Sequence, residues 1–130
     1  MNEVLKDKDE KILNPKIPRY EKRGSTKLNN NSLTSVATFT LNDDIENYDY
    51  LFVVAGAQST YFKNSILIKV SDIVYNNVDN NNSYMISNYT TVGAFALNFC
   101  FPSKTQIKIL DRNADAFGLP NITEVYGINL

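Results

Sequence analysis

From residue 33 to the end of the chain, apolar and polar residues alternate in short segments, which is the pattern of β-strands that bury one face. In the segment 33–41, Phe39 and Leu41 fall on one side, and Thr38 and Thr40 on the other. The segment 65–75 alternates in the same way, and its inward positions are Ile66, Ile68 and Val70. Both segments are therefore predicted to be half-buried strands.

The segment 48–56, YDYLFVVAG, is apolar at nearly every position after its first two residues. One face carries Tyr48, Tyr50, Phe52 and Val54. The other carries Leu51, Val53 and Ala55. Because a strand with two apolar faces is typical of the inside of a fold, we expect a central strand that is packed on both sides.

The segment 92–101, VGAFALNFCF, shows the clearest alternation in the chain. Large residues project to one side: Phe95, Leu97, Phe99 and Phe101. Small or polar residues project to the other: Ala94, Ala96, Asn98 and Cys100. This pattern predicts a strand whose large side faces the core and whose back allows close approach by a neighbouring subunit.

Further short strands are predicted at 84–87, 105–110 and 122–130, for a total of about seven or eight. No helix longer than one or two turns is predicted after residue 33, which excludes a nucleotide-binding fold of alternating strands and helices. The expected fold class is all-β: an antiparallel β-sandwich, similar to a jelly roll, in one head domain at residues 33–130.

Residues 1–32 lack this alternation and are predicted to form an extended N-terminal docking arm. Any helix at its start would end at Pro15 and Pro18, because proline removes a backbone donor. Because this segment is so polar, it cannot bury enough apolar surface by itself to offset the entropy lost on ordering. We therefore expect it to become ordered only against another protein. The residues predicted to make that contact are Val4, Leu5, Ile12, Leu13, Ile17 and Tyr20.

Composition adds a few limits. The formal net charge of −1, with 43% hydrophobic residues, is typical of a globular domain and gives no reason to expect nucleic acid as a partner. The arm is mildly basic, since residues 1–27 hold eight Lys or Arg against five Asp or Glu.

No apolar run is long enough to insert into a membrane. Cys100 is the single cysteine, so no disulfide forms within the chain, and it is expected to be buried.

The residue types also restrict catalysis. The chain has no histidine, which excludes a Ser-His-Asp triad, a Cys-His pair and a histidine-bound metal. Carboxylates gather in the turn of Asp43, Asp44 and Glu46, but neighbouring turn residues usually point apart into water and do not face each other across a cleft. We therefore expect no enzymatic activity and no cofactor.

Two weaker signals concern ligands. The oxygen-rich segments at Asp79 and Asp111 lack the spacing of a calcium-binding loop, so no metal site is predicted. Several tyrosines combine an aromatic face with a hydroxyl group and suit stacking on sugar rings, although packing in the core or an interface competes with that role. They are Tyr48, Tyr50, Tyr61, Tyr75, Tyr84 and Tyr89.

Two motifs carry a resemblance to a known family. The first is FTLNDDIENYDYLFVV, which contains Tyr48, Asp49 and Tyr50, and the second is the closing NITEVYGINL, which contains Tyr126, Gly127 and Ile128. Together they resemble the carboxy-terminal β-sandwich module of bacteriophage virion proteins, such as tail-fibre, baseplate and receptor-binding components. The resemblance covers about residues 37–130 and implies that these six residues form the fold and do not contact a receptor.

The resemblance also implies a location and partners. It predicts a homotrimer on the virion surface, anchored to other virion proteins by the arm and contacting the host surface, with a host glycan as a candidate ligand. The chain lacks the long stalk, the tryptophan and the mid-strand arginine that are common in the family, so a stand-alone knob is expected in place of a complete tail fibre.

Other functions are compatible with a sandwich. A head fibre or capsid decoration protein would use the same head and arm on the capsid shell, and it differs only in the partner of the arm. A carbohydrate-active enzyme would need opposed carboxylates in a cleft. A carbohydrate-binding, lectin-like module of bacterial or toxin origin would be expected as a monomer.

Overall fold

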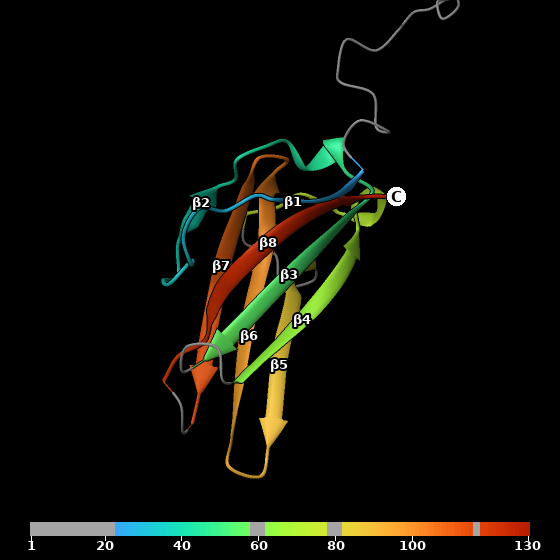
Figure 1. Ribbon diagram of the computed structural model, residues 1–130. Helices are drawn as coiled ribbons and strands as arrows, with labels where there is room; N and C mark the ends of the chain where they lie inside the picture. Colours follow the sequence, from blue (N-terminus) through green and yellow to red (C-terminus); the bar gives the residue numbers. More distant parts are fainter. Residues whose placement is uncertain (1–22, 58–61, 78–81, 116–117) are drawn as a thin grey trace, which may run out of the picture.

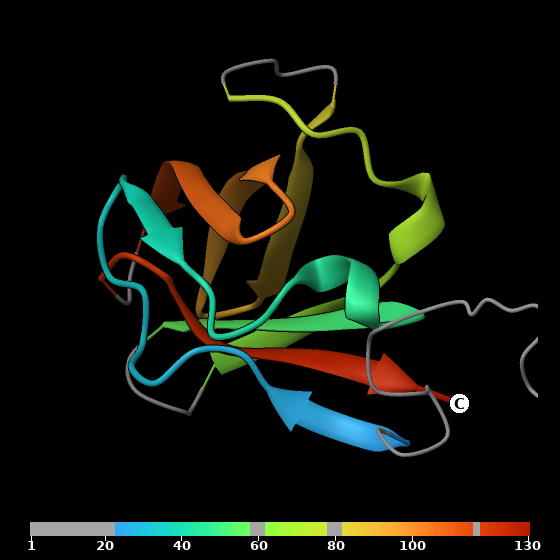
Figure 2. The same ribbon diagram turned by 90° about the horizontal axis from the view of Figure 1, so that it is seen from above.

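The protein is a sandwich of two four-stranded antiparallel sheets (Figures 1 and 2). The computed structural model describes residues 23–57, 62–77, 82–115 and 118–130. In this part of the chain, the helical structure is limited to two short 3₁₀ turns, η3 (Ile45–Asn47) and η4 (Val70–Asp72). The predicted fold class is confirmed.

The first sheet has the strand order β1-β8-β3-β4 and contains the chain terminus marked in Figure 1. Its strands are β1 (Gly24–Lys27), β8 (Asn121–Asn129), β3 (Tyr50–Ala57) and β4 (Phe62–Lys69). The predicted strand at 48–56 is thus central within its sheet, with β8 on one side and β4 on the other.

The second sheet has the strand order β2-β7-β6-β5. Its strands are β2 (Thr38–Thr40), β7 (Gln106–Ala114), β6 (Gly93–Ser103) and β5 (Tyr84–Thr90). Strand β5 is longer than the predicted 84–87, and β7 runs past the predicted end at 110, so the turn-rich loop before β8 is shorter than expected. Figure 2 shows the two sheets as separate layers, connected along one side by the chain between β1 and β2.

The core lies between the sheets and is built from the alternation in the strands. On β6, Phe95, Leu97, Phe99 and Phe101 are all buried, so the predicted register of this strand is confirmed. Phe99 and Phe101 pack edge to face with ring centroids 5.7 Å apart, and Tyr84 of β5 stacks on Phe99. Such aromatic pairs add to the stabilisation that burial of their area provides.

The outer face of β3 differs from the prediction. Leu51, Val53 and Ala55 are buried in the core, and Val54 is buried on the outer face. Tyr50 and Phe52 are only half-buried there, because the described residues form two sheets and neither covers this side of the first sheet. The apolar residues on the outer face of β3 stabilise the structure in another way than by burial in the core. Each outer residue of β3 sits opposite a residue of β8, and these cross-strand contacts stabilise the sheet itself.

The sandwich begins earlier than predicted. Residues 24–27, assigned to the arm by their sequence, pair with β8 as strand β1, and Leu28 is fully buried in the core. The first sheet therefore includes residues on the arm side of the boundary predicted between residues 32 and 33. The residues predicted to make the arm's contacts, Val4, Leu5, Ile12, Leu13, Ile17 and Tyr20, lie outside the described residues.

A buried asparagine explains how the chain leaves the first sheet after β1. The side-chain amide of Asn29 donates to the backbone carbonyls of Asn31 and Thr123, and its oxygen accepts from the N–H of Val125 at 2.8 Å. Backbone pairing resumes where Leu33 bridges to Ile122. The Asn29 side chain thus satisfies the groups of β8 that a longer β1 would have paired, while the main chain turns away.

Candidate functional site

The two motifs found in the sequence meet at one end of the first sheet. Tyr50, at the start of β3, lies opposite Ile128 of β8, and Phe52 lies opposite Tyr126. The side chain of Tyr48 lies against the backbone of Gly127, which is the only residue type that leaves room for the ring there. The opening and closing motifs are therefore parts of one packing unit, although some seventy residues separate them.

The hydroxyl of Tyr48 connects this unit to the turn that precedes it. It donates to a carboxylate oxygen of Asp43 at 2.7 Å, and it also interacts with Thr26 of β1. The other oxygen of Asp43 accepts from the N–H of Asp44 and from the amide of Asn47, which holds the turn ahead of η3. Burial, together with the neighbouring Asp43 carboxylate, raises the pKa of Tyr48 to about 12, so the phenol remains a donor across the neutral range.

The other motif residues also have structural contacts. The backbone N–H of Asp49 donates to the carbonyl of Ile128 and to the side-chain oxygen of Asn129. The amide of Asn129 in turn donates to the carbonyl of Asn47, which satisfies this buried side chain. These contacts connect the start of β3 to the end of β8, and they give Asn129 a role that its sequence position alone did not indicate.

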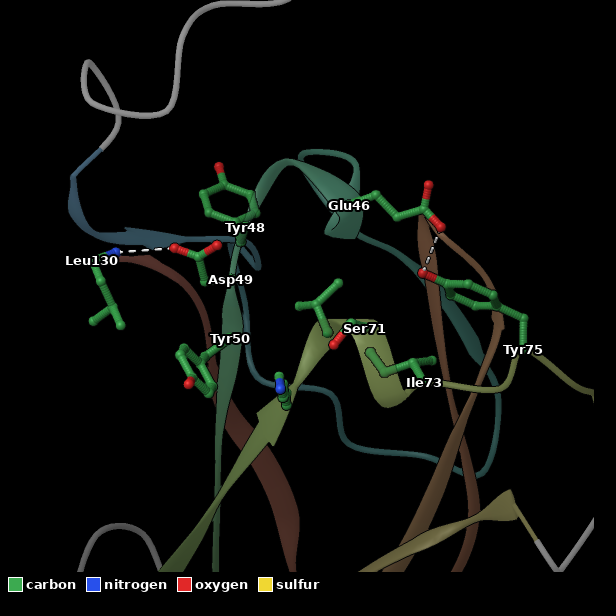
Figure 3. A pocket seen from close by; sticks show the side chains of 10 residues that line it. Glu46, Tyr48, Asp49, Tyr50, Ser71, Ile73, Tyr75 and Leu130 are labelled. Carbon is green, nitrogen blue, oxygen red and sulfur yellow. Dashed lines mark hydrogen bonds between the residues drawn. The ribbon is translucent and has the colours of Figure 1, made fainter.

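A pocket of about 580 Å³ opens at the same end of the molecule and is called the end pocket below. Figure 3 shows two walls, with Glu46 and Tyr75 on one side and Asp49, Tyr50 and Leu130 on the other. Its lining residues are Glu46, Tyr48, Asp49, Tyr50, Lys69, Val70, Ser71, Ile73, Tyr75 and Leu130. They come from the turn before β3, the start of β3, the end of β4, η4 with the segment after it, and the residue after β8.

Two hydrogen bonds hold the walls of the end pocket. The hydroxyl of Tyr75 donates to a carboxylate oxygen of Glu46 at 3.3 Å, and the N–H of Leu130 donates to Asp49 at 3.2 Å (Figure 3). Burial and the charge of Glu46 raise the pKa of Tyr75 to about 12, so its proton stays in place at neutral pH. The hydroxyl of Tyr48 points away from the pocket, toward Asp43.

The sequence identified only part of this pocket. Tyr48, Tyr50 and Tyr75 were among the tyrosines considered for sugar stacking, whereas Tyr84 packs in the core, Tyr89 is exposed elsewhere, and Tyr61 lies outside the described residues. The polar residues of η4 and the end of β4 carried no motif. Alternation assigned residues 65–75 to one strand, and this interpretation missed η4, which turns the chain along the pocket.

Metal binding has no candidate in the part of the chain that the structure describes. There, no group of three or more acidic or cysteine side chains is positioned to hold an ion. The Asp111 carboxylate accepts from the N–H of Arg112 and from the amide of Asn113, and Asp79 lies outside the described residues. Cys100 is buried, as expected, and burial raises the pKa of its thiol.

Two further observations bear on the class of protein. The described residues contain no helix long and apolar enough to cross a membrane. The sequence matches none of the protein-family models compared with it, and no curated protein is significantly similar to it.

Proposed function

We propose that this chain is a bacteriophage virion structural protein, a surface knob whose sandwich head faces outward and whose N-terminal arm anchors it to another virion protein. The head would contact the host surface during attachment. The arm would bind a protein of the tail, of the baseplate or of the capsid. These alternatives differ only in the partner of the arm.

One observation supports this proposal above the others. The residues that carry the resemblance to phage sandwich modules, Tyr48 to Tyr50 and Tyr126 to Ile128, are neighbours on adjacent strands, and Tyr48 requires a glycine at position 127. A chance likeness of two short motifs would have no reason to make them one packing unit. The proposal extends this likeness from fold to function, and that extension needs its own test.

A homotrimer is part of the proposal. The outer face of β6 presents the small residues Ala94, Ala96 and Asn98, which permit close approach of a neighbouring subunit. Met85 and Tyr89 of β5 flank them and are exposed. A cyclic assembly would direct three heads to the host and three arms to the particle, so weak individual contacts would add up to firm attachment.

The test is to locate the protein on the phage particle. Purified virions are labelled with an antibody against residues 23–130 and imaged by electron microscopy. Label on the tail, baseplate or capsid of intact particles is the expected result, and its position identifies the partner class of the arm. Particles that carry no label, while the protein is present in the infected lysate, would overturn the proposal.

A further inference from the structure

The end pocket lies at the end of the sandwich where β3 starts and β4 and β8 end (Figure 1). Its volume of about 580 Å³ falls within the range of about 300–1,000 Å³ that is usual for small-ligand sites. The hollow beside Ala96 and Asn113 on the second sheet is smaller, about 270 Å³, and has few polar groups that converge on it. The end pocket is therefore the stronger candidate for a ligand site.

The lining of the end pocket combines apolar surface with groups that donate and accept hydrogen bonds. Val70 and Ile73 give apolar contact, and Tyr50 and Tyr75 stand on opposite walls. Glu46 and Asp49 supply acceptors, while Lys69 and Ser71 supply donors. A sugar ring has the matching surface, because its C–H groups form an apolar face and its hydroxyls both donate and accept around the rim.

The charge of the lining narrows the class of sugar. Among the lining residues Lys69 is the one basic residue, and it lies in the same pocket as the carboxylate of Glu46, so the lining offers no excess of positive charge for an acidic or phosphorylated ligand. A neutral ligand does not need such an excess. Glu46 can accept from its hydroxyls, and hydrogen bonds to charged groups are the stronger ones.

The position of Tyr75 supports the same conclusion. Its ring is half-buried and its hydroxyl is already bonded to Glu46, so both contacts restrict the movement of the ring on the wall. An aromatic ring that is fixed before binding loses little conformational freedom when a sugar stacks on it.

We infer that the end pocket binds a neutral hexopyranose unit of a glycan, with Tyr75 as the stacking wall and Glu46, Asp49 and Lys69 as hydrogen-bonding partners. The inference rests on the proposed function, since attachment to a bacterium requires a ligand on its surface. It concerns the isolated chain, however, and can be tested without particles.

The experiment is a saccharide titration of the full-length chain labelled with ¹⁵N, followed by NMR. The probes are the methyl glycosides of glucose, galactose, mannose and N-acetylglucosamine, with glucuronic acid as the acidic comparison. We expect at least one neutral glycoside to bind with a Kd of about 1–10 mM, the range of weak single sites. The amides of Asp49, Ser71 and Leu130 should shift, and glucuronic acid should bind at least about tenfold more weakly than the best neutral glycoside.

Variants separate a specific site from general weak affinity. Tyr75→Ala and Glu46→Gln are expected to weaken binding by about tenfold or more, since each removes a principal contact. Glu46→Gln also serves if Tyr75→Ala fails to fold, because Glu46 is exposed and the change keeps its shape. Val36→Ala is the control: it shortens an exposed apolar side chain outside the pocket and should leave Kd within about twofold.

Three results would overturn the inference. They are the absence of shifts at about 50 mM of every neutral glycoside, shifts centred on Ala96 and Asn113 in place of the end pocket, and equal weakening by Val36→Ala and Glu46→Gln. Preferential binding of glucuronic acid would also refute it. Any of these results can occur while antibody label is still found on the virion, so failure of the glycan site and failure of the virion assignment are distinguishable.

Discussion

The ring of Tyr48 lies so close to Gly127 that a Cβ atom placed on this glycine would be 2.5 Å from Cγ of the tyrosine. Real Cβ atoms do not approach other heavy atoms to this distance, and the ring is enclosed, since Tyr48 is 1% exposed. The glycine is therefore required by packing. It also has no left-handed backbone angle, so conformational freedom is not the reason for its presence.

Gly127→Ala is accordingly expected to reduce the free energy of unfolding by about 3 kcal/mol or more, near the upper end for overpacking of a core. Urea unfolding followed by circular dichroism measures the loss. The same substitution in a Tyr48→Ala background should cost much less, because the obstructing ring is gone. Equal costs in the two backgrounds would show that the Tyr48 contact is not what makes alanine unfavourable.

Asn29→Ala should cost about 1–3 kcal/mol, because it leaves the N–H of Val125 and the carbonyl of Thr123 buried without their partner. The neighbouring Asn30→Ala is the control. Asn30 is exposed, and its side chain accepts from the amide of Asn42, which is exposed too, so its loss should change stability by less than about 0.5 kcal/mol. Hydrogen exchange gives a local measurement. The amide of Val125 should exchange faster in Asn29→Ala at pH 7, and unchanged protection would contradict the assigned role.

Parts of this arrangement could be predicted from the sequence and parts could not. The alternation in residues 92–101 identified the buried face of β6, because the large side chains on one side and the small ones on the other leave one choice of register. Strand β1 was missed, because all four residues of GSTK are exposed and show no apolar alternation. Its pairing depends on the edge of β8 and on the burial of Leu28 next to it.

The end pocket shows the same limit. Tyr75 and Glu46 are 29 positions apart, and only the turn at η4 brings the segment after β4 back across the start of β3. Apolar residues follow again at Ile73 and Val74, which favoured one long strand, but the alternation breaks after Val70, where Asp72 falls on the inward side. The outer face of β3 was misjudged for a related reason, since cross-strand packing and packing under a second layer both favour apolar residues such as Phe52.

Phe99→Ala tests the core of the second sheet. Phe99 is completely buried and contacts the rings of Tyr84 and Phe101, so truncation should cost about 3–5 kcal/mol through lost burial and a residual cavity. Leu67→Ala on the exposed face of β4 is the control and should cost less than about 1 kcal/mol. Chemical denaturation of both variants measures the difference, and a small loss for Phe99→Ala would contradict the register described here.

The raised pKa values of Tyr48 and Tyr75 predict a loss of stability at alkaline pH. The ordinary tyrosine value is 10.0, and both are raised to about 12, so the folded state holds these protons more tightly than the unfolded state. Their contribution is complete below pH 10 and is lost as the pH rises to about 12. Urea midpoints measured from pH 9 to 11.5 should fall over this window. Tyr48→Phe should reduce the slope, and a slope equal to that of the wild type would contradict the pKa of Tyr48.

The boundary between arm and head can be located by two deletions. Removal of residues 1–22 leaves β1 and its pairing with β8 intact, so the head should keep its unfolding free energy within about 1 kcal/mol. Removal of residues 1–29 takes away β1, the buried Leu28 and the hydrogen bonds of Asn29, and it should cost several kcal/mol or prevent folding.

Under the proposed function, the shorter deletion yields a folded protein that does not enter phage particles. Complementation of a phage that lacks the gene, followed by immunoblotting of purified virions, measures this. Normal incorporation of the folded 23–130 protein would assign attachment to the head instead of the arm, whereas a shorter deletion that unfolds would place residues before Arg23 in the structure of the head.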